Sequence, residues 1–160
     1  PPGQVVVASG AYKDGSAILI SGTEEDGSVA PIALPNDQLS RRLSTALDEL
    51  GQGSSRCVGY TIGAFYFQPV SLIQDLVLNR DLPGESPVGY VEMEQAGLFS
   101  VAARMNRAAA SIVAGSDRYT VVADQLTHRF EPDFDADAAE RVMLRAAAAA
   151  LGVGDLWPGG

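Results

Sequence analysis

An uncharged, apolar stretch from Cys57 to Phe67 predicts a buried strand. Its residues are mainly β-branched or aromatic, and no proline occurs before Pro69. Both faces of such a strand are apolar, which is typical of the middle of a sheet. Gly59 and Gly63 lie on one of these faces, four residues apart. Because glycine weakens a strand interior, the pair predicts that a helix, a bulge or a ligand comes close to the sheet there.

The hydrophobic pattern before this strand predicts an antiparallel meander. Apolar, β-rich segments cover residues 4–12, 16–22 and 28–34, and an Asp-Gly pair lies in each of the two links between them. Asp-Gly between two such segments is a strong hairpin signal. A helix is predicted over 36–50, where Asn36 or Asp37 can cap the start and leucines recur every three or four positions.

Helical spacing after the central strand predicts a helix over 69–79, although its start also alternates like a strand. Residues 88–94 alternate as a strand, and 97–103 are expected to pair with them. Small residues predict a helix over 105–114. In the next segment, apolar residues four apart favour a helix through residue 128, while 119–122 alone also fit a strand.

Asp135 is expected to cap a last helix that runs to about Leu151 and contains an unbroken alanine run. These elements predict one α+β domain over residues 1–160. Its meander and central strand form one mixed or antiparallel sheet, packed by several helices including the alanine-rich C-terminal one. Residues 1–3 and 155–160 resemble linkers or tails.

The charge excludes several kinds of partner. The formal net charge is -9, so nucleic-acid binding is not expected, because phosphate contacts need a basic surface. No apolar run reaches the length of a membrane span and no secretory signal is recognised, which predicts no membrane insertion and a cytoplasmic location. Since 46% of residues are hydrophobic and only 19% charged, part of the apolar excess is expected to face a partner.

Few residues here suit metal or nucleophilic chemistry. Cys57 and His128 are the only cysteine and histidine, so the usual zinc sites and internal disulfides are excluded. The alternating aspartates 133, 135 and 137 fail the calcium-loop pattern, since Ala138 and Leu144 occupy the positions that need glycine and glutamate. We therefore predict no metal site and no cofactor. A reactive Cys57–His128 pair is an alternative, but a thiol in an apolar strand is usually inert.

The absence of a complete catalytic constellation favours a non-catalytic protein-interaction or self-assembling module, whose partner is another protein or a second copy of the chain. The candidate interface residues are Ala146, Ala148, Ala150 and Trp157. The alternative is a small-molecule sensor or enzyme with an aromatic-lined pocket around the central strand. Its candidate ligand-binding residues are Arg56, Tyr60, Phe65, Tyr66, Glu92 and His128, and Glu92 with Glu94 could form a carboxylate pair for acid–base work.

Overall fold

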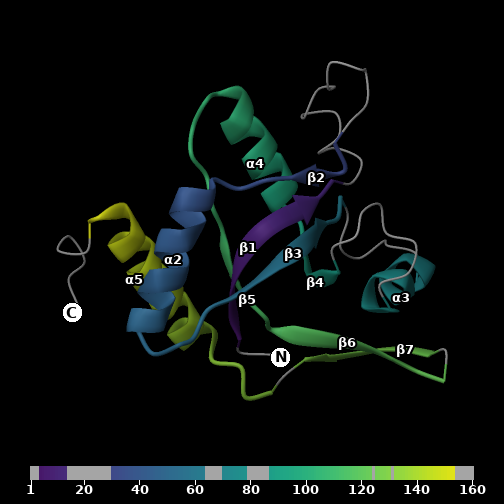
Figure 1. Cartoon of the computed structure of the whole chain (residues 1–160). Coiled ribbons are helices and arrows are strands. Elements are labelled where there is room, and N and C mark those ends of the chain that lie inside the picture. The colour runs from purple at the N-terminus through teal and green to yellow at the C-terminus, as the bar shows by residue number, and fades with distance from the viewer. Residues whose placement is uncertain are drawn as a thin grey trace.

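The computed structural model describes residues 4–13, 30–63, 70–78, 87–123, 125–130 and 132–153. Its elements form a mixed sheet, a separate hairpin and four labelled helices within these ranges (Figure 1). In chain order they are β1 (Val5–Tyr12), β2 (Ile32–Ala33), α2 (Asp37–Glu49), β3 (Ser55–Thr61), α3 (Val70–Leu78), β4 (Val88–Glu92), α4 (Gln95–Arg104), β5 (Ile112–Ala114), β6 (Asp117–Val122), β7 (Gln125–Phe130) and α5 (Ala136–Leu151).

The larger sheet has β1, β3 and β4 side by side and parallel, with β3 in the middle. The other edge of β1 is shared by two antiparallel strands: β5 pairs with its first half and β2 with its end. The α+β class, the mixed sheet and the central position of the predicted strand are thus confirmed. The strand predicted over 57–67 is observed as β3 over Ser55–Thr61, and residues 64–67 lie outside the described residues. A meander would pair its third strand with its second, whereas β2 pairs directly with β1. The second predicted strand, over 16–22, lies outside the described residues.

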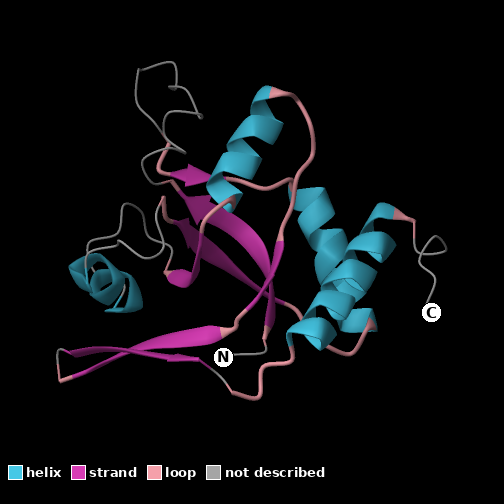
Figure 2. Cartoon of the chain, turned by 180° about the vertical axis from the view of Figure 1, so that it is seen from behind, coloured by secondary structure: helices cyan, strands magenta, loops and turns pink. Residues whose placement is uncertain are grey.

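The first strand is covered on both faces because its side chains enter two hydrophobic clusters. Val5 and Val7 pack with α2 and α5, whose buried members include Leu47 and Ala146. Ala8 belongs to a second cluster formed largely by α4 and β2. Figure 2 shows α2 and α5 lying side by side, apart from α4. The apolar composition of β1 follows from this burial on both sides.

Two helices begin where the sequence places their caps. The Asn36 side chain accepts a hydrogen bond from the Leu39 N–H at 2.9 Å, and Asp135 accepts one from the Ala138 N–H at 2.8 Å. Gly152 ends α5 with a left-handed φ of 72°, a conformation that glycine adopts without steric cost. The predicted helices at 36–50, 69–79 and 135–151 are confirmed, with α3 over Val70–Leu78.

Residues 97–103 form part of α4 rather than a strand paired with 88–94. Ala96, Phe99 and Ser100 share the buried face at helical spacing. The predicted strand is therefore wrong, and this spacing was the signal that favoured a helix.

The predicted helix over 105–114 is also wrong. Its end forms β5, where Val5, Val6 and Val7 pair with Ala114, Val113 and Ile112. Alanine has the highest helix propensity, but intrinsic propensity is a weak preference, and pairing with a buried strand overrides it.

The segment predicted to be helical through residue 128 is a hairpin of β6 and β7. Figure 1 shows it extending away from the larger sheet, beside α3. Ala123 in the connecting turn has a φ of 48°, although the usual residues there are glycine and asparagine. Because neither glycine nor asparagine marks this turn, the apolar residues spaced four positions apart were interpreted as a helix. Among the described helices, none has both the length and the apolar composition to cross a membrane.

Candidate active site

The parallel strands β1, β3 and β4 end at one edge of the sheet, which we call the carboxyl edge. Tyr12 is paired with Tyr60 there, and Thr61 with Glu92. Ligands of open α/β sheets bind outside the carboxyl ends of parallel strands. This edge is therefore where a site is expected on topological grounds.

A tight turn joins β4 to α4 at the carboxyl edge, and Glu92 holds it. One oxygen of the Glu92 carboxylate accepts the Thr61 hydroxyl, and the other accepts the backbone N–H groups of Glu94 and Gln95, each at 2.6 Å. The Thr61 hydroxyl oxygen in turn accepts the Ala96 N–H at 3.0 Å. Both oxygens of Glu92 are thus engaged within the protein.

Glu94 differs from Glu92 in its surroundings. It is the N-cap residue of α4, but its side chain makes no capping hydrogen bond. It is exposed, as is the neighbouring Met93, whose relative exposure is 43%. A carboxylate is favoured beside the positive end of a helix. The carboxyl edge therefore offers one accessible carboxylate beside one that is fully engaged.

A second hydrogen-bond network also contacts the first residue of α4. The Tyr90 hydroxyl donates to the Gln95 side-chain oxygen at 2.5 Å, and the Gln95 amide donates to the Ser111 hydroxyl at 2.8 Å. Burial, more than the nearby charges, raises the pKa of Tyr90 well above its ordinary value. Tyr90 is thus a neutral hydrogen-bond donor at ordinary pH.

The close approach predicted at Gly59 is made by Tyr90. A Cβ atom on Gly59 would lie 2.5 Å from the Tyr90 ring. The pairing of β3 with β4 also shifts register between Val58 and Gly59. A side chain and a bulge therefore account for this glycine without a ligand.

The structure brings together only some of the predicted ligand-binding residues. Tyr60 lies one residue before the end of β3, near Glu92, and its ring is 6.1 Å from that of Tyr12. Arg56 lies at the opposite end of β3 and contacts Asp37 at 3.4 Å. Phe65 and Tyr66 fall outside the described residues. The pocket predicted from all six residues is thus not assembled by the described ones.

His128 lies on the β6–β7 hairpin. Its Nε2 atom is 2.6 Å from the Asp117 carboxylate, and its ring stacks on Tyr119 with centroids 4.6 Å apart. Burial first, and then the charge of Asp117, raises the pKa of Tyr119. Asp117 follows β5, which runs antiparallel to β1, so this cluster lies toward the amino end of β1. His128 is therefore at the opposite end of the sheet from Glu92.

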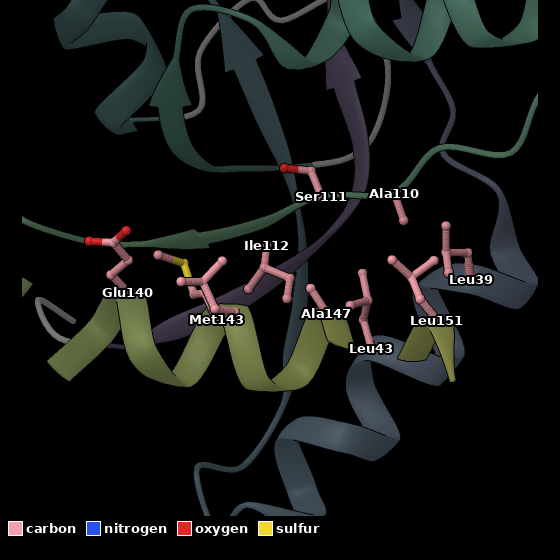
Figure 3. Close-up of a pocket in the computed structure, with 10 residues that line it drawn as sticks. Leu39, Leu43, Ala110, Ser111, Ile112, Glu140, Met143, Ala147 and Leu151 are labelled. Carbon is pink, nitrogen blue, oxygen red and sulfur yellow. The ribbon is translucent and has the colours of Figure 1, made fainter. Parts of the chain in front are cut away.

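An apolar pocket of about 360 Å³ lies between α2, α5 and the start of β5. Figure 3 shows its side chains converging from these three segments. The lining residues are Leu39, Leu43, Ala110, Ser111, Ile112, Glu140, Met143, Leu144, Ala147 and Leu151. Ser111 and Glu140 are the polar members of this lining, which offers few groups to orient a polar ligand.

The alanine helix packs inside the chain. Ala146 is fully buried and Ala150 is 5% exposed, both in the cluster with α2 and β1. The expectation that these two residues face another chain is therefore corrected: their small side chains allow α5 to pack closely on its own neighbours. Ala148 is half-buried, and Trp157 lies outside the described residues.

Within the described ranges, no group of three or more His, Cys, Asp or Glu side chains could hold a metal ion. Cys57 is half-buried against β4, and this burial raises the pKa of its thiol. A raised pKa leaves less of the nucleophilic thiolate.

Sequence reasoning missed Thr61 entirely. It also placed Glu94 on a strand with Glu92, whereas β4 ends at Glu92 and Glu94 lies in the turn. Nothing local marks Thr61, because its partners are 31 and 35 positions away.

Comparison with known proteins decides the family. The family model of the phosphorylase superfamily matches residues 1–151. The chain belongs to the phosphorylase superfamily. No curated protein sequence matches this superfamily member significantly.

Solved structures share the fold of this superfamily member at low sequence identity. Purine nucleoside phosphorylase from Toxoplasma gondii, in complex with immucillin-H, matches with a TM-score of 0.64 and 18% identity, over 98% of this chain and 58% of that one. AMP nucleosidase from Bacteroides thetaiotaomicron matches with a TM-score of 0.64 and 16% identity, over 96% and 53%. The chain thus spans little more than half the length of either structure.

Membership of the phosphorylase superfamily overturns the prediction of a non-catalytic interaction module, together with the protein-binding and self-assembly role that it implied. The matched structures are both named as enzymes. The alternative prediction, a small-molecule enzyme, agrees better with these findings.

Proposed function

We propose that this chain provides the sugar-binding part of an enzyme that cleaves the N-glycosidic bond of a purine nucleoside or nucleotide. The family match over residues 1–151 supports an enzyme of this superfamily. The names of both matched structures denote enzymes of purine nucleosides or of AMP. A ribose attached to a purine base is the part that these substrates share.

The accessible carboxylate of Glu94 is the observation that carries this proposal. Adjacent sugar hydroxyls are hydrogen-bond donors, and a carboxylate has two oxygens that can accept one bond from each of them. Glu94 is exposed at the carboxyl edge, while the oxygens of Glu92 are already engaged. Glu94 is therefore our candidate for binding the ribose, with Met93 beside it as an apolar contact for the sugar.

The proposed reaction breaks the bond between the anomeric carbon of the sugar and a nitrogen of the base. A nucleophile, water or phosphate, bonds to that carbon, and the departing base takes up a proton. Both nucleophiles are represented among the matched structures, one named a nucleosidase and the other a phosphorylase. A requirement for added phosphate in the assay would distinguish the two.

The test combines binding and turnover. Release of free base would be measured with inosine, adenosine and AMP, each with and without inorganic phosphate, and immucillin-H binding would be measured by calorimetry. We expect Glu94→Gln to weaken immucillin-H binding and to reduce turnover, because an amide accepts at only one of its two terminal atoms. Glu49→Gln, at an exposed position on α2, is the matched control. Absence of both binding and base release in the wild-type protein would refute the proposal.

We also propose that the reaction takes place in the cytoplasm. The free thiol of Cys57 is compatible with a reducing compartment. Fractionation of the source cells, followed by detection of the protein, would test this location.

A further inference from the structure

We propose that Thr61 and Glu92 are positioning residues, which fix the turn before α4 so that the Glu94 carboxylate faces the substrate. This inference rests on the proposed function, because it assigns to Glu94 the contact with the sugar. It gives the two carboxylates on either side of Met93 different roles. Glu92 acts within the protein, and Glu94 acts on the ligand.

The hydrogen bonds of Glu92 support its proposed role within the protein. Its side chain accepts three donors from two different parts of the chain: the Thr61 hydroxyl and the N–H groups of Glu94 and Gln95. Its backbone oxygen also accepts the Ile62 N–H at 2.8 Å. The end of β3, the end of β4 and the first turn of α4 are thus joined through one residue.

Thr61 completes the connection because its hydroxyl both donates and accepts a hydrogen bond. It donates to Glu92 and accepts the Ala96 N–H at 3.0 Å. Its relative exposure is 5%, so water has little access to replace these bonds. A buried donor or acceptor that loses its partner costs free energy, and this cost favours the single arrangement in which all of these groups are paired.

The position of Glu94 supports its proposed role in contacting the ligand. Its N–H is held by Glu92, and its C=O accepts the Leu98 N–H at 2.9 Å. The backbone of Glu94 is therefore fixed at both ends, while its exposed side chain makes no capping bond. A ligand group on a fixed backbone loses less entropy on binding than one on a mobile turn.

The chemistry of Glu92 explains why a carboxylate is needed there. All three partners of the side chain donate protons, so both of its oxygens must accept. In Glu92→Gln one oxygen would be replaced by an NH₂ group, which would face donors. Thr61→Val keeps the side-chain shape but removes both hydrogen bonds of the hydroxyl, whereas Thr61→Ser keeps the hydroxyl.

The experiment compares Thr61→Val, Thr61→Ser, Glu92→Gln and Glu94→Gln with the wild-type protein by two measurements. Amide hydrogen exchange at residues 94–96, without ligand, reports on the turn. Immucillin-H affinity reports on the site. We expect Thr61→Val and Glu92→Gln to increase exchange at these amides by at least about 2- to 10-fold, the range that each net hydrogen bond lost gives, and to weaken immucillin-H binding by a similar factor.

The other two variants separate the roles. Thr61→Ser should restore both measurements to nearly wild-type values. Glu94→Gln should weaken binding while leaving the exchange rates unchanged. Thermal melting of each variant checks that the fold is retained. If Thr61→Val fails to fold, the Glu92→Gln variant tests the inference by the same two measurements.

Unchanged exchange in both Thr61→Val and Glu92→Gln would overturn the inference, as would faster exchange with unaltered binding. If the wild-type protein neither binds immucillin-H nor releases base, the proposed function fails, and with it the positioning role. The exchange rates would still show in that case whether Glu92 and Thr61 hold the turn. The two failures are therefore distinguishable.

Discussion

The Thr61 hydroxyl donates a hydrogen bond to the Glu92 carboxylate across 31 positions of the sequence. This contact joins two neighbouring parallel strands at their carboxyl ends, where the next helix also begins. A turn that connects a strand to a helix is usually stabilised by residues within it. Here a residue from the adjacent strand contributes, so the geometry of the turn depends on correct pairing of β3 with β4.

Gly59 and Gly97 provide a matched pair of glycine substitutions. A Cβ on Gly59 would lie 2.5 Å from the Tyr90 ring, whereas one on Gly97 meets nothing within 4 Å. We expect Gly59→Ala to lower the free energy of unfolding by about 1–3 kcal/mol. Gly97→Ala, within α4, should raise it by about 0.5–1 kcal/mol. Urea denaturation of both variants tests this, and equal effects would contradict the Tyr90 contact.

Ala146 tests the packing of α5. Ala146→Glu would bury a charge without a partner in the cluster with Leu47 and Val7, so we expect the free energy of unfolding to fall by about 3 kcal/mol or more. Ala149→Glu, at an exposed position of the same helix, should change it by less than about 0.5 kcal/mol. The measurement is again urea denaturation. A stable, folded Ala146→Glu protein would show that this residue is not in the core.

The half-buried Tyr90 hydroxyl predicts a loss of stability at alkaline pH. Burial raises its pKa in the folded state above the unfolded value of about 10. Between these two values the unfolded chain binds fewer protons than the folded one, so the free energy of unfolding falls as the pH rises. Its contribution is complete below the unfolded pKa and is lost progressively above it.

Tyr90→Phe removes this titration, so the free energy of unfolding of the variant should decline less steeply above about pH 10. At neutral pH the variant should lose about 0.5–1.5 kcal/mol, because its hydrogen bond to Gln95 is absent. Urea midpoints measured across this pH range test both effects. Parallel pH curves for the two proteins would show that Tyr90 does not cause the decline.

The Asn36 cap gives a prediction that follows from the sequence and the structure alike. Asn36→Ala removes the acceptor for the Leu39 N–H and should cost about 1 kcal/mol of stability. Gln38→Ala, exposed in the first turn of α2, is the control and should be nearly neutral. Thermal melting followed by circular dichroism provides the comparison, and a neutral Asn36→Ala variant would contradict a capping role.

The sequence by itself determined the elements whose signals are local. The caps at Asn36 and Asp135 and the leucine spacing of α2 predicted two helices at nearly their observed bounds. The uncharged stretch from Cys57 placed β3 inside the sheet, because only a strand covered on both faces can be apolar on both. These signals suffice where neighbouring residues supply the stabilising contacts.

The tertiary structure alone decided the remaining elements and the candidate site. Residues 112–114 form a strand because β1 offers them backbone partners, despite the helical preference of their alanine-rich surroundings. In the candidate site, the sequence singled out Glu92 but not its role, which depends on the distant Thr61 hydroxyl. Partners 31 and 35 positions away leave no periodic or capping signal in the chain, so only the folded arrangement shows which carboxylate is engaged and which is accessible.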